Sequence, residues 1–250
     1  SYTKIDEIPF DFTRRRMSVI VAKSGQRMLI TKGAPEGVLE ACTRLELGPD
    51  GADAGDMTPE LRAAVLDEFE RLSSNGYRAV AVAYRTIGNG REVYSIADES
   101  NMTFVGYVSF VDPPKESTRE ALEQAEALGV EIKILTGDNE LVTARICERV
   151  GLKVKGVLMG QDVDALDDSE LAARAEQATV CARLSPDQKD RIIAALKRSG
   201  HVVGYMGDGI NDAPSLRTAD VGVSVSNAVD VAREAADIIL LEEGLHVLET

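Results

Sequence analysis

Cysteine is scarce in this 250-residue chain, and tryptophan is absent. The three cysteines, Cys42, Cys147 and Cys181, are far apart and form no Cys-x-x-Cys pair. This spacing argues against a zinc site and against a disulfide framework, and it fits a reducing compartment. Aromatic residues make up only 4% of the chain, which disfavours a platform that stacks single-stranded nucleic acid.

Long apolar runs are also lacking. No stretch approaches the ~20 apolar residues that a membrane-spanning helix needs, and Ser1 does not begin a signal peptide, so we expect a soluble chain. Basic residues are outnumbered, and the formal net charge is -14. Such an acidic surface repels phosphate backbones, so the sequence predicts no nucleic-acid partner.

Two kinds of pattern divide the chain. Up to residue 111, strand signals joined by tight turns alternate with two helix signals, which predicts an α+β domain with a mostly antiparallel sheet. We expect a hairpin around Ser24-Gly25, a helix from Pro35 to about Cys42, and a longer helix capped by Thr58 and ended by Asn75-Gly76. Loops or turns are predicted at 48–56 and 88–90, and strands at 77–87 and 102–110.

Asp112-Pro113-Pro114 marks the predicted hinge, because two consecutive prolines cannot continue a helix. Helix and strand signals alternate regularly over 112–250, which predicts a parallel sheet covered by helices, an α/β domain. The predicted helices are 116–128, 140–150, 169–177 and 186–197 with a short one after Asp212, and the predicted strands are 130–135, 180–184, 201–206 and 221–225.

Ligands of such sheets bind beyond the carboxyl ends of the strands, and two polar clusters follow predicted strands there. They are Thr136-Gly137-Asp138-Asn139 and Gly207-Asp208-Gly209-Ile210-Asn211-Asp212. The Thr136 hydroxyl could donate to a phosphoryl oxygen, and the Asp208 carboxylate is the hard oxygen ligand that Mg²⁺ prefers. Lys189, at the start of a predicted helix, could pair with a phosphoryl group. The Thr136 motif and Lys189 are weak signals alone, whereas the second cluster is stronger because glycines and acids alternate in it after an apolar strand. Together they predict a phosphate-and-magnesium site.

The first domain has the ingredients of a nucleotide pocket. Phe12 lies beside Arg14, and Lys32-Gly33 follows an apolar strand. A ring that stacks on a purine and nearby cations that attract phosphates are what such a pocket needs.

Four motifs stand in the order seen in P-type ATPases, and the chain resembles that family over essentially its whole length. They are Lys32-Gly33-Ala34-Pro35-Glu36, Asp112-Pro113-Pro114, Thr136-Gly137-Asp138-Asn139 and Gly207-Asp208-Gly209-Ile210-Asn211-Asp212-Ala213-Pro214. The segments 8–19 and 225–241 resemble the magnesium-transporting branch.

The resemblance implies that 1–111 is part of a nucleotide-binding domain and that 112–250 is a phosphorylation domain of the haloacid-dehalogenase type. It implies an adenine stacked on Phe12, a pocket lined by Arg14, Lys32 and Gly33, and phosphates near Arg78. It also implies that Asp208 and Asp212 bind Mg²⁺. The residues that it implies around an aspartyl-phosphate are Thr136, Gly137, Asp138, Lys189, Asn211 and Asp212. ATP and Mg²⁺ are the expected cofactors. The expected partners are the transmembrane and actuator domains of a parent protein at the cytoplasmic face of the membrane, and the chain alone is expected to be monomeric.

The sequence departs from the family in two places. Lys115 stands where the hinge motif usually has arginine, and no Asp-Lys-Thr-Gly-Thr segment occurs, so the phosphorylated aspartate is expected to precede residue 1. Two alternatives stay open from the residues: a haloacid-dehalogenase phosphatase with a cap domain, and a nucleotide-binding module without catalysis.

Overall fold

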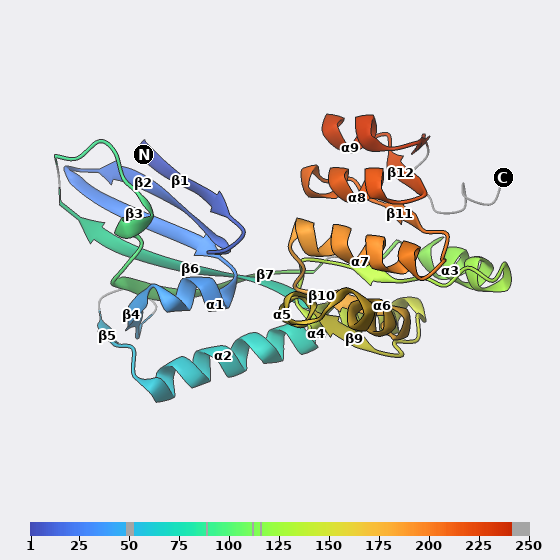
Figure 1. Ribbon diagram of the computed structural model, residues 1–250. Helices are drawn as coiled ribbons and strands as arrows, with labels where there is room; N and C mark the ends of the chain where they lie inside the picture. The colour runs from blue at the N-terminus through green and yellow to red at the C-terminus, as the bar shows by residue number, and fades with distance from the viewer. Residues whose placement is uncertain (49–52, 89, 112, 116, 242–250) are drawn as a thin grey trace. The chain divides into compact units, whose positions relative to one another are not determined.

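The computed structural model describes residues 1–48, 53–88, 90–111, 113–115 and 117–241, which form two compact units (Figure 1). Unit 1 is Ser1–Asp112 and unit 2 is Pro113–Thr250, so the boundary lies at the two prolines. Asp112, the first residue of the hinge motif, lies outside the described residues. In the part of the chain that is described, no helix is long and apolar enough to cross a bilayer.

A mixed seven-stranded sheet, in the order β1-β2-β3-β6-β7-β4-β5, forms the centre of unit 1. Every neighbouring pair is antiparallel except β4 with β7, so the predicted mostly antiparallel sheet is confirmed. The strands are β1 (Thr3–Asp11), β2 (Arg16–Lys23), β3 (Gln26–Gly33), β4 (Cys42–Glu46), β5 (Ala54–Asp56), β6 (Tyr77–Ile87) and β7 (Met102–Val111).

Local sequence signals explain most of these elements. Ser24 and Gly25 join β2 to β3 with φ of 51° and 79°, the backbone that matches the twist of a two-residue hairpin. The Thr58 side chain accepts a hydrogen bond from Leu61 N (3.3 Å) at the start of α2, and Gly76 follows that helix with φ of 84°. The helical elements of unit 1 are α1 (Pro35–Glu40), α2 (Pro59–Ser74) and η1 (Ile96–Asp98).

Three predictions in unit 1 need correction or fall outside the structure. The first helix ends at Glu40, and Cys42 instead begins β4, where it pairs with Met102. The predicted loop at 48–56 contains β5, while 49–52 lie outside the described residues. The turn predicted at 88–90 includes Asn89, which also lies outside them.

One face of the unit 1 sheet carries the core. Ile20, Leu29 and Met102 are fully buried there together with Val38 of α1, and partly buried Val65 of α2 packs against them. Figure 1 shows α1 and α2 along the same side of the sheet. Because successive side chains of a strand point to opposite faces, the residues between the core positions point to the other face.

Unit 2 contains two parallel three-stranded sheets, in the orders β8-β10-β9 and β11-β12-β13. The strands are β8 (Ile134–Leu135), β9 (Val157–Met159), β10 (Val180–Ala182), β11 (Gly204–Met206), β12 (Val221–Val225) and β13 (Ile238–Leu240). The helical elements are α3 (Ser117–Ala127), α4 (Glu140–Val150), α5 (Gly160–Ala165), α6 (Asp168–Gln177), α7 (Pro186–Arg198), η2 (Ile210–Asp212), α8 (Ala213–Thr218) and α9 (Asp230–Ala235). The predicted alternation with parallel pairing is confirmed, but the described strands form two sheets and not one.

Several predicted strands are shorter in the structure. The strand predicted over 130–135 pairs only at Ile134–Leu135, because its neighbour β10 is itself only three residues long. The strands predicted over 201–206 and 180–184 are likewise reduced to β11 and β10. The predicted helices end within one residue of the predicted positions, and Gly151 follows α4 with φ of 83°.

Helix α7 joins the two sheets of unit 2 in one packed structure. Ile192 belongs to the hydrophobic cluster around β10, and Ile193 belongs to the cluster around β11 and α8. Leu135 of β8 and Val203, just before β11, pack against both clusters. The ends of β8 and β11 are therefore held near the same helix.

Candidate nucleotide and phosphoryl sites

Phe12 lies in the turn that joins β1 to β2, defined here as the Phe12 turn (Asp11–Arg16). Its side chain is 46% exposed, and its ring contacts Phe10 edge-on with the ring centroids 5.1 Å apart. Asp11 holds the turn, because its carboxylate accepts from Arg14 N (2.9 Å) and its carbonyl accepts from Arg15 N (2.7 Å). The exposed ring is accessible to a stacking partner.

Lys32 and Arg78 lie on one face of the unit 1 sheet. Lys32 is directly opposite Val82 in the β3–β6 ladder, so their side chains share a face. Arg78 is four residues from Val82 along β6 and therefore points the same way. This face is opposite to that of fully buried Thr31, and both cations are exposed.

Gly33 brings the Phe12 turn to the same end of the sheet. It pairs with Arg16 across the β2–β3 ladder, and a Cβ atom at Gly33 would lie 2.3 Å from the Arg15 carbonyl oxygen. Only a residue without a side chain permits this approach. Phe12, Lys32, Gly33 and Arg78 thus come from three segments that meet at one end of the sheet.

Arg14 takes a different direction. Its guanidinium bonds the buried carboxylate of Glu99 (Nη1–Oε2, 2.5 Å) and the Pro9 carbonyl (2.9 Å), and its side chain is only 16% exposed. The sequence reasoning placed Arg14 in the pocket and did not single out Glu99, since an acidic residue in a loop carries no signal that it is buried.

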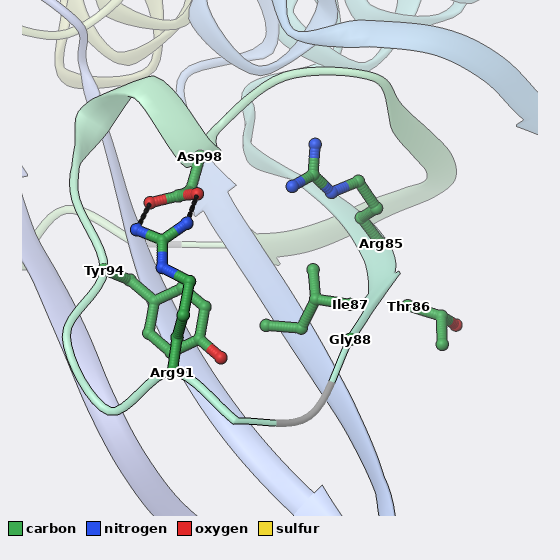
Figure 2. A pocket seen from close by; sticks show the side chains of 7 residues that line it. All are labelled: Arg85, Thr86, Ile87, Gly88, Arg91, Tyr94 and Asp98. Carbon is green, nitrogen blue, oxygen red and sulfur yellow. Dashed lines mark hydrogen bonds and ion pairs between the residues drawn. The ribbon is translucent and has the colours of Figure 1, made fainter.

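The cavity drawn in Figure 2 lies at the other end of β6, away from Arg78. It has a volume of about 340 Å³, and Arg91 crosses it to make two hydrogen bonds with Asp98 (2.9 and 3.2 Å). Arg85 Nη1 donates to the Ser100 carbonyl (2.8 Å). Both arginines that line the cavity are thus paired with protein groups, and none of the predicted nucleotide-binding residues lines it. The lining residues are Arg85, Thr86, Ile87, Gly88, Arg91, Tyr94 and Asp98.

In unit 2, the loop after β8 is tied to the loop after β10. Thr136 N donates to Cys181 O (2.9 Å), Leu184 N donates to Thr136 O (3.0 Å), and a Cβ atom at Gly137 would lie 3.3 Å from Leu184 O. The Thr136 hydroxyl accepts from Asp138 N (3.1 Å), which leaves its own proton available for a ligand oxygen. The Asn139 side chain caps α4, because its Oδ1 accepts a hydrogen bond from Leu141 N.

Lys189, in the first turns of α7, joins this arrangement to the loop after β11. Its ammonium group lies 2.8 Å from Asp212 Oδ1, which also accepts a hydrogen bond from the Tyr205 hydroxyl (2.7 Å). Gly209 N donates to the other carboxylate oxygen (3.1 Å). Asp212 is buried, so this carboxylate is a fixed part of the loop.

The pKa values reflect these contacts. Burial alone would raise the pKa of Asp212, but hydrogen bonds from Lys189 and Tyr205 outweigh it and lower the pKa below its usual value. Burial, and then the hydrogen bond to Asp212, raise the pKa of Tyr205. Tyr205 therefore remains a neutral donor to the Asp212 carboxylate at neutral pH. Sequence reasoning missed it, because a tyrosine in an apolar strand is typical of core.

Asp208 and Asn211 are exposed in the same loop, in contrast to Asp212. The loop is compact, since a Cβ atom at Gly207 would lie 2.5 Å from Asp212 Cβ. No group of three or more histidine, cysteine, aspartate or glutamate side chains able to hold a metal occurs among the residues described. Asp208 is an accessible carboxylate suited to Mg²⁺, whereas Asp212 is engaged by Lys189 and Tyr205.

Comparison with known proteins identifies the family. Residues 1–117 match the family model described as the cytoplasmic N domain of P-type ATPases. Over 99% of its length the chain is 50% identical to an Escherichia coli K12 protein named "Magnesium-transporting ATPase, P-type 1", and 51% identical to the protein of that name from a Salmonella typhimurium strain. It is 32% identical over 96% of its length to "Calcium-transporting ATPase 1" of Lactococcus lactis. The chain spans 27% of the length of each of these relatives. The chain therefore belongs to the P-type ATPase family.

Proposed function

We propose that this chain is the ATP-handling cytoplasmic part of a magnesium-transporting P-type ATPase. Unit 1 binds the nucleotide, and unit 2 is the phosphorylation domain, of the haloacid-dehalogenase type. The observation that carries the second assignment is the contact between Lys189 and Asp212, because it joins the loops that follow β10 and β11 at the carboxyl ends of parallel strands. The two sheet edges and the relatives' names support it further.

The edges of β8 and β11 support an incomplete sheet. Among the described strands, β8 pairs only with β10, and β11 pairs only with β12. Leu135 and Val203 pack against the same two hydrophobic clusters, and each cluster contains a residue of α7. One additional parallel strand fits this position in our proposal. In the parent protein it would carry the Asp-Lys-Thr-Gly-Thr segment, which the 250 residues do not contain.

In the proposed reaction, a carboxylate oxygen of that aspartate attacks the γ-phosphorus of ATP, and the bond to the β–γ bridging oxygen breaks to release ADP. The Lys189 ammonium offsets charge on the transferred phosphoryl group, while Asp212 and Tyr205 hold it in place. The Thr136 hydroxyl donates a hydrogen bond to a phosphoryl oxygen. Asp208 would hold Mg²⁺, which supplies further charge neutralisation. Water then cleaves the acyl phosphate to release phosphate.

The transported ion is proposed from the comparisons. Relatives named for magnesium transport are 47–51% identical, against 32% for one named for calcium transport. The partners we propose are the transmembrane and actuator domains of the parent protein, with this chain at the cytoplasmic face of the membrane.

A labelling experiment tests the proposed chemistry. Incubation of the chain with γ-labelled ATP and Mg²⁺, followed by acid precipitation, should give no label above a heat-denatured control, because none of the site residues is a suitably placed nucleophile. A longer protein that also contains the upstream segment should be labelled, and changing its motif aspartate to asparagine should abolish the label. Strong labelling of the 250-residue chain alone would show that another carboxylate is the nucleophile and that our roles are wrong.

A further inference from the structure

Glu99 is a buried carboxylate in unit 1 that the nucleotide-site motifs do not include. It follows η1 in the connection from β6 to β7, and its side chain is 0% exposed. One oxygen, Oε2, contacts Arg14 Nη1 (2.5 Å) and Arg16 Nε (2.9 Å), and the other accepts from the Ser18 hydroxyl (2.7 Å). These three donors compensate the cost of burying the Glu99 side chain.

Both arginines belong to the Phe12 turn, so Glu99 acts on the backbone that presents the ring. Arg16 also donates to the carbonyl of Gly37 in α1. Arg15 between them has φ of 52°, an unfavourable backbone for a residue with a long side chain, and its carbonyl accepts from Ala34 N (2.8 Å). Such a backbone persists when surrounding contacts hold it.

The glycines of the neighbouring segment show how closely the turn is seated. A Cβ atom at Gly37 would lie 2.4 Å from the Arg14 carbonyl oxygen, and one at Gly33 would lie 2.3 Å from that of Arg15. The turn therefore rests on the segment that begins with Lys32. The Glu99 carboxylate holds the turn through the guanidinium groups of Arg14 and Arg16. The side chains of these two arginines are 16% and 12% exposed.

We propose that Glu99 is a positioning residue of the nucleotide site: it holds Arg14 and Arg16 and so fixes Phe12 at the end of the sheet that carries Lys32. The inference rests on the nucleotide-binding function proposed for unit 1. The proposal also changes the role expected for Arg14, because its guanidinium group pairs with Glu99 and is not directed to a phosphate. Loss of the Glu99 contacts should then weaken binding of the base, which Phe12 stacks, and not only of the phosphates.

The test uses the 250-residue chain with Glu99→Gln, and Asp98→Asn is the matched control. The hydrogen bonds of the Asp98 side chain go to Arg91 in the Figure 2 cavity and to Ser95, and among the described residues none goes to the Phe12 turn. Dissociation constants for adenosine, ADP and ATP are measured by NMR titration, and thermal unfolding shows that each variant is folded. Glu99→Gln should weaken all three ligands by a similar factor, about tenfold. Lys32→Ala should weaken ATP more than adenosine, and Asp98→Asn should change none of them.

Arg14→Lys provides a second test that does not depend on the folding of Glu99→Gln. Lysine keeps the charge but cannot contact both Glu99 and Pro9 with a planar fork, so adenosine binding should weaken together with ATP binding. If folded Glu99→Gln or Arg14→Lys leaves adenosine affinity unchanged, the positioning role is wrong. If the unaltered chain binds none of the three ligands, the proposed function of unit 1 fails instead.

Discussion

At the scale of single residues, two aspartates four positions apart in one loop have different environments. Asp208 is exposed at the end of β11, whereas Asp212 is buried between Lys189 and Tyr205. The glycine and aspartate pattern predicts that the loop carries chemistry, but it does not predict this division. The division depends on Tyr205, which comes from the preceding strand and has no distinguishing sequence signal.

Substitution of the two aspartates should therefore affect different properties of the chain. Asp212→Asn should lower the free energy of unfolding of unit 2 by about 1–3 kcal/mol at neutral pH, because Lys189 and Tyr205 lose a charged partner. Asp208→Asn should leave stability almost unchanged and weaken the binding of Mg²⁺. Denaturant unfolding and a Mg²⁺ titration of both variants measure this. Equal destabilisation by both substitutions would contradict our assignment.

The lowered pKa of Asp212 adds a pH dependence. A carboxyl group whose pKa is lower in the folded state contributes stability above its unfolded pKa of about 3.9, and the contribution is lost as the pH falls through the folded pKa. Between pH 7 and pH 3, the free energy of unfolding should fall more steeply for the unaltered chain than for Asp212→Asn. Parallel pH profiles would show that the ion pair contributes nothing.

The three cysteines allow a third test at this scale. All are buried and free, and burial raises the pKa of Cys42 and of Cys181 to about 11. The folded chain should thus react very slowly with a thiol reagent at pH 8, and all three thiols should react after unfolding. Burial of the neutral thiols of Cys42 and Cys181 also makes stability depend on pH, because their pKa is raised in the folded state. Their contribution to the free energy of unfolding is fully present below about pH 8.5, the pKa of an unfolded cysteine, and is lost as the pH rises toward 11. Rapid labelling of a folded thiol would contradict the burial.

At the scale of elements, prediction succeeded where a terminus had its own signal. Helix α4 begins after Asn139 and ends at Val150, just before Gly151, and α7 begins after Ser185 with Pro186, so these bounds could be predicted from capping residues. Elements without such signals were missed, among them β9 and β13, because three residues are too short to display a period. Strand lengths were overestimated at β8 and β11, where pairing depends on neighbours that the sequence does not reveal.

The edge of β8 makes a prediction for amide exchange. Ile134 N and Thr136 N donate toward β10, so the alternate residue, Leu135, directs its N–H to the opposite side. Leu135 should exchange its amide hydrogen faster than Thr136 in the 250-residue chain. In a longer protein that contains the Asp-Lys-Thr-Gly-Thr segment, Leu135 should become protected, whereas an unchanged rate would show that no strand pairs there.

At the scale of the whole molecule, charge is distributed unequally between the two halves. Residues 1–111 carry 13 basic and 16 acidic side chains, and residues 112–250 carry 15 and 26. The predicted nucleotide cations therefore lie in the nearly balanced half, and the predicted magnesium ligand lies in the acidic half. The family could be predicted because its motifs are spread over both halves. The buried contacts of Arg14 could not, since they involve Glu99, which is 85 positions away in sequence.

Nucleotide binding by unit 1 is the central claim, and an NMR titration of the 250-residue chain with ATP in the absence of Mg²⁺ tests it most directly. Ring stacking and cationic contacts need no metal, so weak binding should shift the amide signals around Phe12, Lys32 and Arg78. Phe12→Ala should reduce the binding free energy by roughly 1–3 kcal/mol if stacking operates as it does for bases on aromatic side chains. Absence of shifts at these three positions, or shifts confined to unit 2, would contradict the account.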